Sequence, residues 1–131
     1  MADISGLLPA SGAIVDRVSF DYQSRLVFRD GLEVVLESSF RVVTDAVEHL
    51  IDPEDLRTVT PLLSLLHDEL VTALISERSE LSLAFASGTL LTAPPDEQYE
   101  SWHLVHADGR MAIAMPGGAI AVFPAQVPET G

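Results

Sequence analysis

An internal repeat is the feature that most constrains how this chain can fold. Residues 18–36 form three short runs of alternating apolar and polar residues, and residues 75–93 show the same pattern 57 positions later. Runs of this length and period are typical of β-strands, and the small polar residues between them are typical of turns. The sequence therefore predicts a duplicated, antiparallel, three-stranded meander with these matched anchors: Val18 and Ile75, Leu26 and Leu83, Phe28 and Phe85, Gly31 and Gly88.

The alternation of apolar and polar residues defines the length of the second turn in each meander. A two-residue turn at Asp30-Gly31 would place Phe28 opposite Glu33 and mix apolar and polar side chains on one face. A three-residue loop that ends at Gly31 restores the alternation, and such a loop requires a positive φ at its last residue. Because glycine adopts that conformation without strain, we expect a positive φ at both Gly31 and Gly88.

The connection between the repeats contains two signals for the start of a helix. Asp52-Pro53 and Thr60-Pro61 each combine a capping side chain with proline at the first helical position. We therefore expect one or two short helices within residues 52–69. Residues 40–51 stay open, since the first of them can extend a strand and the later ones can form a loop or a helical turn.

The C-terminal third predicts two further hairpins. Asp108-Gly109 and Pro116-Gly117 are both strong signals for two-residue turns. Turns of that length place large apolar side chains in the core, namely Met111, Ile113, Ile120 and Val122. They leave a strip of four alanines on the other face, and we expect the leucine-rich segment 62–70 or a second copy of the chain to cover it. The strip consists of Ala112, Ala114, Ala119 and Ala121.

Together these patterns predict one α+β domain over residues 1–131, made mainly of antiparallel β-structure. The expected architecture is a duplicated three-stranded meander plus C-terminal hairpins, arranged as a sandwich or a partly open barrel, with one or two short helices between the repeats. The expected segments are a first meander at about 13–43, a helical connection at about 52–69, a second meander at about 70–93 and a C-terminal meander at about 101–123.

The charge of the chain is strongly one-sided. Its 20 acidic residues against 7 basic ones give a formal charge of −13, which repels nucleic acids and anionic membranes and attracts basic partners. A hydrophobic content of 47% is high for so charged a domain and favours a homo-oligomer. The first 17 residues show neither a basic region nor an unbroken apolar run, so we expect a cytoplasmic protein without membrane association.

The sequence shows no pattern for catalysis, metal ligation or cofactor binding. There is no cysteine and no Gly-x-Ser-x-Gly nucleophile motif. His103 and His106 have the spacing of paired metal ligands on a helix, but in a strand an odd offset sends them to opposite faces. His67 is better explained as a residue that ends a short helix. We therefore expect no catalytic residue, no metal site and no cofactor.

One acidic loop with aromatic residues is the candidate partner surface. It contains the only tryptophan of the chain and one of its two tyrosines, between strands and among carboxylates. Aromatic side chains anchor protein interfaces, and charges steer the encounter with a partner of opposite sign. For the tryptophan the alternative is a place in the core beside Leu104. The candidate residues are Asp96, Glu97, Tyr99, Glu100 and Trp102.

A set of spaced residues in the second half of the chain resembles a known family. The set is Phe85-x-x-Gly88, Pro95-Asp96, Tyr99-Glu100-x-Trp102 and Pro116-Gly117-Gly118 followed by Ala121-Val122. In these residues the chain is similar to a family of short actinobacterial proteins of unknown function, best over residues 70–123. It departs from them at Phe123, where family members have a tryptophan. The resemblance implies one domain and a bacterial cytoplasmic setting, and it supplies no catalytic residue.

These observations favour a small, acidic, non-enzymatic protein-binding module. Its most concrete form is an immunity or antitoxin-like protein that occludes a basic partner. Two alternatives stay open. A structural homo-oligomer without a dedicated heteropartner would account for the apolar surplus, whereas a small hydrolase or metal-dependent enzyme would need a metal or a buried carboxylate in an apolar pocket.

Overall fold

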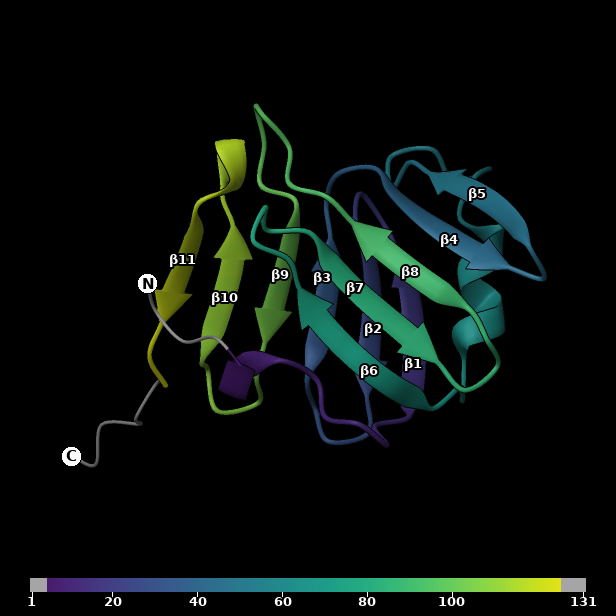
Figure 1. The fold of residues 1–131 in the computed structure, drawn as a ribbon, viewed down its shortest axis with the longest axis horizontal. Helices are drawn as coiled ribbons and strands as arrows, with labels where there is room; N and C mark the ends of the chain where they lie inside the picture. Colours follow the sequence, from purple (N-terminus) through teal and green to yellow (C-terminus); the bar gives the residue numbers. More distant parts are fainter. Residues whose placement is uncertain (1–4, 126–131) are drawn as a thin grey trace.

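Two antiparallel sheets packed face to face make up the computed structural model, which describes residues 5–125 (Figure 1). The first sheet has the order β1 (Val15–Phe20), β2 (Ser24–Phe28), β3 (Glu33–Leu36), β9 (Trp102–Val105), β10 (Met111–Ala114) and β11 (Ile120–Phe123). The second has the order β5 (Val47–Ile51), β4 (Phe40–Thr44), β8 (Leu90–Ala93), β7 (Leu81–Phe85) and β6 (Leu70–Ile75). The predicted antiparallel sandwich is confirmed. No helical segment in the described part is long and apolar enough to cross a membrane.

The predicted duplication is confirmed in the meanders β1–β3 and β6–β8, but the anchor Val18–Ile75 is wrong. Val18 pairs with Leu26, whereas the residue that pairs with Leu83 is Ala73, because the loop between β6 and β7 is two residues longer than the loop between β1 and β2.

Gly31 and Gly88 both have a φ of +92°. Each closes a three-residue loop, because the N–H of Phe28 donates to the oxygen of Leu32 at 2.9 Å and the N–H of Phe85 donates to that of Thr89 at 2.9 Å. Glycine at the third loop position therefore sets the same strand register in both halves.

Reciprocal backbone hydrogen bonds relate the two halves by an approximate two-fold axis. The N–H of Gly12 donates to the oxygen of Leu70 at 2.7 Å, and in the equivalent bond the N–H of His67 donates to the oxygen of Val15 at 2.8 Å. The register of β1 shifts just after Val15, and the register of β6 shifts just after Leu70. The repeat thus extends to the irregularities of its first strand, which bend that strand across the sandwich.

The strand that follows each meander crosses into the opposite sheet. β4 pairs with β8 of the second meander, and β9 pairs with β3 of the first. Each sheet therefore consists of one meander and strands from the other half, which are β4–β5 in the five-stranded sheet and β9–β11 in the six-stranded sheet. Residues 40–51, which the sequence leaves open, form the β4–β5 hairpin. This exchange joins the halves through backbone hydrogen bonds, so neither sheet is complete within one half.

Of the two short helices considered between the repeats, one is present. It is the 3-10 helix η2 (Thr60–Leu65), which has Pro61 in its first turn and buries Leu62 and Leu65. At Asp52-Pro53, the other predicted helix start, the chain forms turns instead of a helix. A carboxylate oxygen of Asp52 accepts the N–H of Glu54 at 3.0 Å. Such a local bond stabilises a turn in place of the first helical turn. The remaining 3-10 segments are η1 (Ser5–Leu7) and η3 (Pro116–Gly118).

The predicted alanine strip is wrong, because both C-terminal turns are one residue longer than expected. The N–H of His106 donates to the oxygen of Arg110 at 2.8 Å, and the N–H of Met115 donates to that of Ala119 at 2.7 Å. A shift of one residue moves every side chain to the other face. Ala112 and Ala114 are therefore fully buried. They lie beside the large core side chains of β9, where Leu104 pairs with Ala112.

Candidate binding groove

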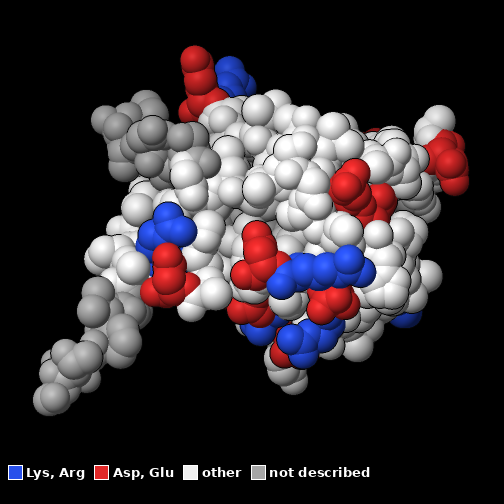
Figure 2. Space-filling view, turned by 90° about the horizontal axis from the view of Figure 1, so that it is seen from below, with Lys and Arg blue, Asp and Glu red and all other residues white. Residues whose placement is uncertain are grey.

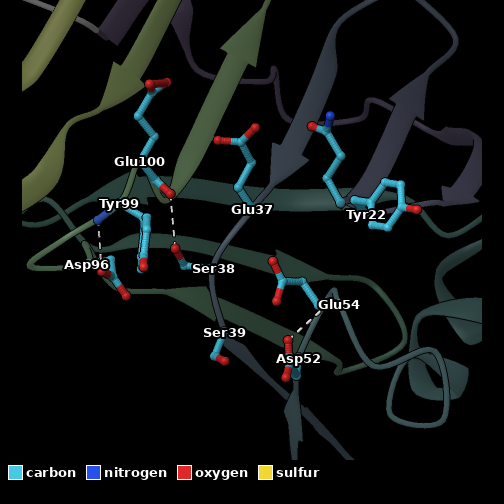
Figure 3. A pocket seen from close by; sticks show the side chains of 10 residues that line it. Tyr22, Glu37, Ser38, Ser39, Asp52, Glu54, Asp96, Tyr99 and Glu100 are labelled. Atoms are coloured by element: carbon cyan, nitrogen blue, oxygen red, sulfur yellow. Dashed lines mark hydrogen bonds between the residues drawn. The ribbon is translucent and has the colours of Figure 1, made fainter.

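A groove opens at the end of the sandwich where the two crossing connections lie together (Figure 3). Its volume is about 590 Å³, and four segments line it: the β1–β2 loop, the β3–β4 connection, the turn after β5 and the β8–β9 connection. Figure 3 shows Asp52 and Glu54 on one side of the groove and Asp96 and Tyr99 on the other. The lining residues are Tyr22, Gln23, Glu37, Ser38, Ser39, Asp52, Glu54, Asp96, Tyr99 and Glu100.

Hydrogen bonds between the two connections hold the groove in shape. The N–H of Glu37 donates to the oxygen of Ser101 at 2.8 Å, and the hydroxyl of Ser38 donates to the oxygen of Glu100 at 3.0 Å. Within the longer connection, one carboxylate oxygen of Asp96 accepts the N–H of Gln98 at 2.8 Å and that of Tyr99 at 3.0 Å. The C-terminal end of this surface loop is therefore tied to the β3–β4 connection, and local hydrogen bonds to Asp96 hold its middle.

The lining is acidic and aromatic. Five of its side chains are carboxylates and none is an arginine, although the chain has seven arginines. Both tyrosines of the chain stand at the groove, with 85% of Tyr22 and 67% of Tyr99 exposed. Negative charge next to open aromatic faces is the environment in which a cationic group binds best, since both attract it.

The candidate residues from the sequence divide into three groups. Asp96, Tyr99 and Glu100 line the groove. Glu97 is exposed but does not belong to the lining. Trp102 is fully buried, and its indole N–H donates to the oxygen of Ser79 at 2.9 Å, so the core alternative is correct for this residue.

Comparison with known proteins gives one result. A family model described as a family of unknown function (DUF6188) matches residues 7–124. The chain belongs to this family. No curated protein and no solved structure matches the chain. Membership confirms the resemblance to a family without an assigned activity, so the site of this DUF6188 protein has to be interpreted from its own geometry.

Sequence reasoning missed most of the groove, since only three of its ten lining residues were candidates. Tyr22, Glu37 and Asp52 lie far from the acidic loop in the chain and reach it only through the exchange of strands between the sheets. One local signal was available: Asp21-Tyr22 places a tyrosine beside a carboxylate, as Tyr99-Glu100 does. That signal marks a second acidic aromatic turn, but it does not say that the two turns meet.

Outside the groove, most arginines of the DUF6188 chain pair with acids, and Figure 2 shows such neighbouring blue and red side chains. The pairs are Arg25 with Glu33, Arg29 with Asp16, Arg41 with Glu48, Arg57 with Asp55 and Arg110 with Asp108. Within residues 5–125, no arginine lies within 4.0 Å of a groove carboxylate. The groove therefore holds five carboxylates without an arginine within 4.0 Å, while the rest of residues 5–125, with 13 acids against 7 arginines, is acidic as well.

A histidine lies beside two of the groove carboxylates. His103 is on the outward face of β9, and its Nε2 is 3.1 Å from an oxygen of Glu37 and 3.3 Å from an oxygen of Glu100. His106 does not join it, since its Nε2 instead lies 2.9 Å from the backbone oxygen of Leu7. The expectation that the two histidines do not form a joint site therefore agrees with the contacts, but the group around His103 was not foreseen.

Proposed function

We propose that this protein is a small cytoplasmic, non-enzymatic binding module whose acidic groove receives a basic segment of a partner protein, as an immunity or antitoxin protein would. The observation that carries the proposal is the gathering of five carboxylates and both tyrosines around one groove without an arginine. Carboxylates bind guanidinium and ammonium groups through charge-assisted hydrogen bonds, and tyrosine rings stack on guanidinium planes.

The size of the groove supports a segment of chain as the ligand. A volume of about 590 Å³ accommodates a few side chains. Arginine suits this lining better than lysine, because it can bridge two carboxylates and stack on Tyr22 or Tyr99 at the same time. A net charge of −13 adds long-range attraction, which speeds the encounter with a basic partner.

The experiment uses a fluorescent arginine-rich peptide and two variants of equal charge. Asp52→Asn with Glu54→Gln removes two negative charges from the groove, and Glu69→Gln with Glu77→Gln removes two from outside it. We expect the groove variant to weaken peptide binding by about 10-fold or more. The control variant should weaken it less than about twofold, since it changes only the distant field. Equal losses in both variants would show general attraction to an acidic surface and contradict the proposal.

A second candidate function, a structural homo-oligomer, is favoured by one specific surface. The outward face of the five-stranded sheet, which faces the viewer in Figure 1, carries exposed Leu50, Leu74 and Leu90, at 66%, 60% and 38%. The only charged strand residues on that face are Arg41 and Glu48, which pair at 3.5 Å. In Figure 2 the upper part of the surface, which belongs to this side, is largely white.

Such a face allows a second copy to approach a highly acidic protein with little repulsion. Leu74→Glu with Leu90→Glu should then convert a dimer to a monomer in sedimentation equilibrium while the fold is retained. A wild-type protein that is monomeric at high concentration would remove this candidate and leave the groove proposal unaffected.

A further inference from the structure

Three side chains of types that can bind a metal ion converge at the edge of the groove, on the outward face of the six-stranded sheet. They are Glu37, which follows β3, Glu100, which precedes β9, and His103 within β9. One ligand atom from each lies within 4.8 Å of the others. Two strands of different halves thus contribute to one small cluster.

The distances within the cluster match those between neighbouring ligands of one metal ion. With metal–ligand bonds of about 2.1 Å, neighbouring ligand atoms are about 3.0 Å apart in an octahedron and about 3.4 Å apart in a tetrahedron. Nε2 of His103 lies 3.1 Å from Glu37 and 3.3 Å from Glu100. The imidazole and both carboxylates can therefore reach one ion with small side-chain adjustments.

Hydrogen bonds from His103 alone do not satisfy both carboxylates of the cluster. Nε2 of a neutral imidazole carries one proton or one lone pair, so it can donate to only one of the two carboxylates fully. Within residues 5–125, no arginine lies within 4.0 Å of Glu37 or Glu100. A divalent cation would accept the imidazole lone pair and bind both carboxylates at once.

The backbone holds the three ligands in place before any ion binds. In the β3–β9 ladder Val35 pairs with His103, and just beyond its end the N–H of Glu37 donates to Ser101 at 2.8 Å. The hydroxyl of Ser38 fixes the backbone oxygen of Glu100 at 3.0 Å. Sites whose ligands are placed by rigid elements lose little entropy when the metal binds. His103 is also shielded, with only 15% of its side chain exposed.

We propose that Glu37, Glu100 and His103 bind a divalent first-row transition-metal ion, with Zn²⁺ as the leading candidate. One imidazole nitrogen with two carboxylates is a borderline donor set that favours such ions over Mg²⁺ and Ca²⁺, which prefer oxygen alone. Three protein ligands leave at least one coordination position for water or a further donor. The metal-site proposal does not depend on the basic partner, because the contacts proposed for that partner also include Asp52 and Glu54, which are not part of the cluster.

The test is calorimetric titration of the full chain with Zn²⁺ and, separately, with Mg²⁺. We expect the wild type to bind one Zn²⁺ per chain and to prefer it clearly to Mg²⁺. His103→Ala should weaken Zn²⁺ binding by at least about 10-fold and abolish the preference. His49→Ala, a half-buried histidine of β5, is the matched control and should change nothing. Bound Zn²⁺ should also raise Tm in the wild type and in His49→Ala only.

Two isosteric variants keep the test decisive if His103→Ala does not fold. Glu37→Gln and Glu100→Gln retain the side-chain shape, and each should weaken Zn²⁺ binding by at least about 10-fold. Zn²⁺ affinity that survives His103→Ala and both Gln variants, or that is no stronger than Mg²⁺ affinity, would overturn the proposal. Asp52→Asn with Glu54→Gln should leave Zn²⁺ binding intact and His103→Ala should leave peptide binding intact, so the two proposals fail separately.

Discussion

The two crossing connections of the sandwich occupy equivalent places but differ in length and composition. The first, between β3 and β4, has three residues, 37–39, and the second, between β8 and β9, has eight, 94–101. Each carries the chain from the third strand of a meander into the opposite sheet, and each leads to a buried aromatic residue, Phe40 or Trp102.

The difference shows where a duplicated fold can acquire a site. The core follows the repeat, because the alternating strands and the glycine loops bury equivalent faces in both halves. The groove follows the departure from the repeat: the longer connection supplies Asp96, Tyr99 and Glu100, and the shorter one supplies Glu37 beside them. A surface loop can change in length at little cost to stability, whereas a core strand cannot.

The largest expected effect tests whether the two crossings are equivalent in the core. Phe40→Ala and Trp102→Ala should each lower the free energy of unfolding by about 3–5 kcal/mol, because each leaves a cavity between the sheets. Urea denaturation measures both values. A loss below about 1 kcal/mol at either position would break the structural equivalence of the two halves.

The glycine loops should show a smaller and unequal effect. An alanine Cβ at Gly88 would meet no atom within 4 Å, whereas at Gly31 it would lie 3.1 Å from the Cβ of Ala107. Gly88→Ala should therefore cost about 1 kcal/mol, from the positive φ alone. Gly31→Ala should cost about 2 kcal/mol, because the contact with Ala107 adds to the strain. Equal losses in thermal denaturation would show that the β9–β10 loop yields to the new methyl group.

At the junction between the halves, substitutions at two equivalent positions should change the free energy of unfolding in opposite directions. Gly12 has a φ of +93°, and its counterpart His67 has a φ of +69° although it is not glycine. His67→Gly should raise the free energy of unfolding by about 0.5 kcal/mol, since it relieves the left-handed strain. Gly12→Ala should lower it by about 1 kcal/mol. If His67→Gly destabilises the protein, the histidine side chain contributes more than its backbone strain costs.

The smallest expected effect concerns the hairpin turn between β9 and β10. The N–H of Arg110 donates to the carboxylate of Asp108 at 2.9 Å, and this bond, with smaller help from the guanidinium, lowers the pKa of Asp108. The charged carboxylate therefore stabilises the folded state at neutral pH, and this contribution disappears as the pH falls through the lowered pKa. Asp108→Asn should be slightly less stable than the wild type at pH 7 and equally stable at about pH 2 in urea titrations. A difference that persists in acid would assign the effect to turn geometry instead.

The sequence by itself determined the local pairing of the meanders. Alternation of apolar residues requires Phe28 and Phe85 to face the core, and a glycine three positions later then sets the loop length. These features depend on residues a few positions apart, so steric and hydrophobic rules decide them locally. The acidic loop with Tyr99 was visible for the same reason, because its composition is a local property.

The tertiary structure alone decided which strands share a sheet and which side chains meet. At the C-terminal hairpins, turn residues allow either two or three loop residues, and packing of small Ala112 and Ala114 beside bulky Leu104 and Trp102 selects the longer loop. Glu37 meets Glu100 only because β3 pairs with β9. Pairing between segments so far apart depends on how both sheets bury their faces together, and no short stretch of sequence contains that information.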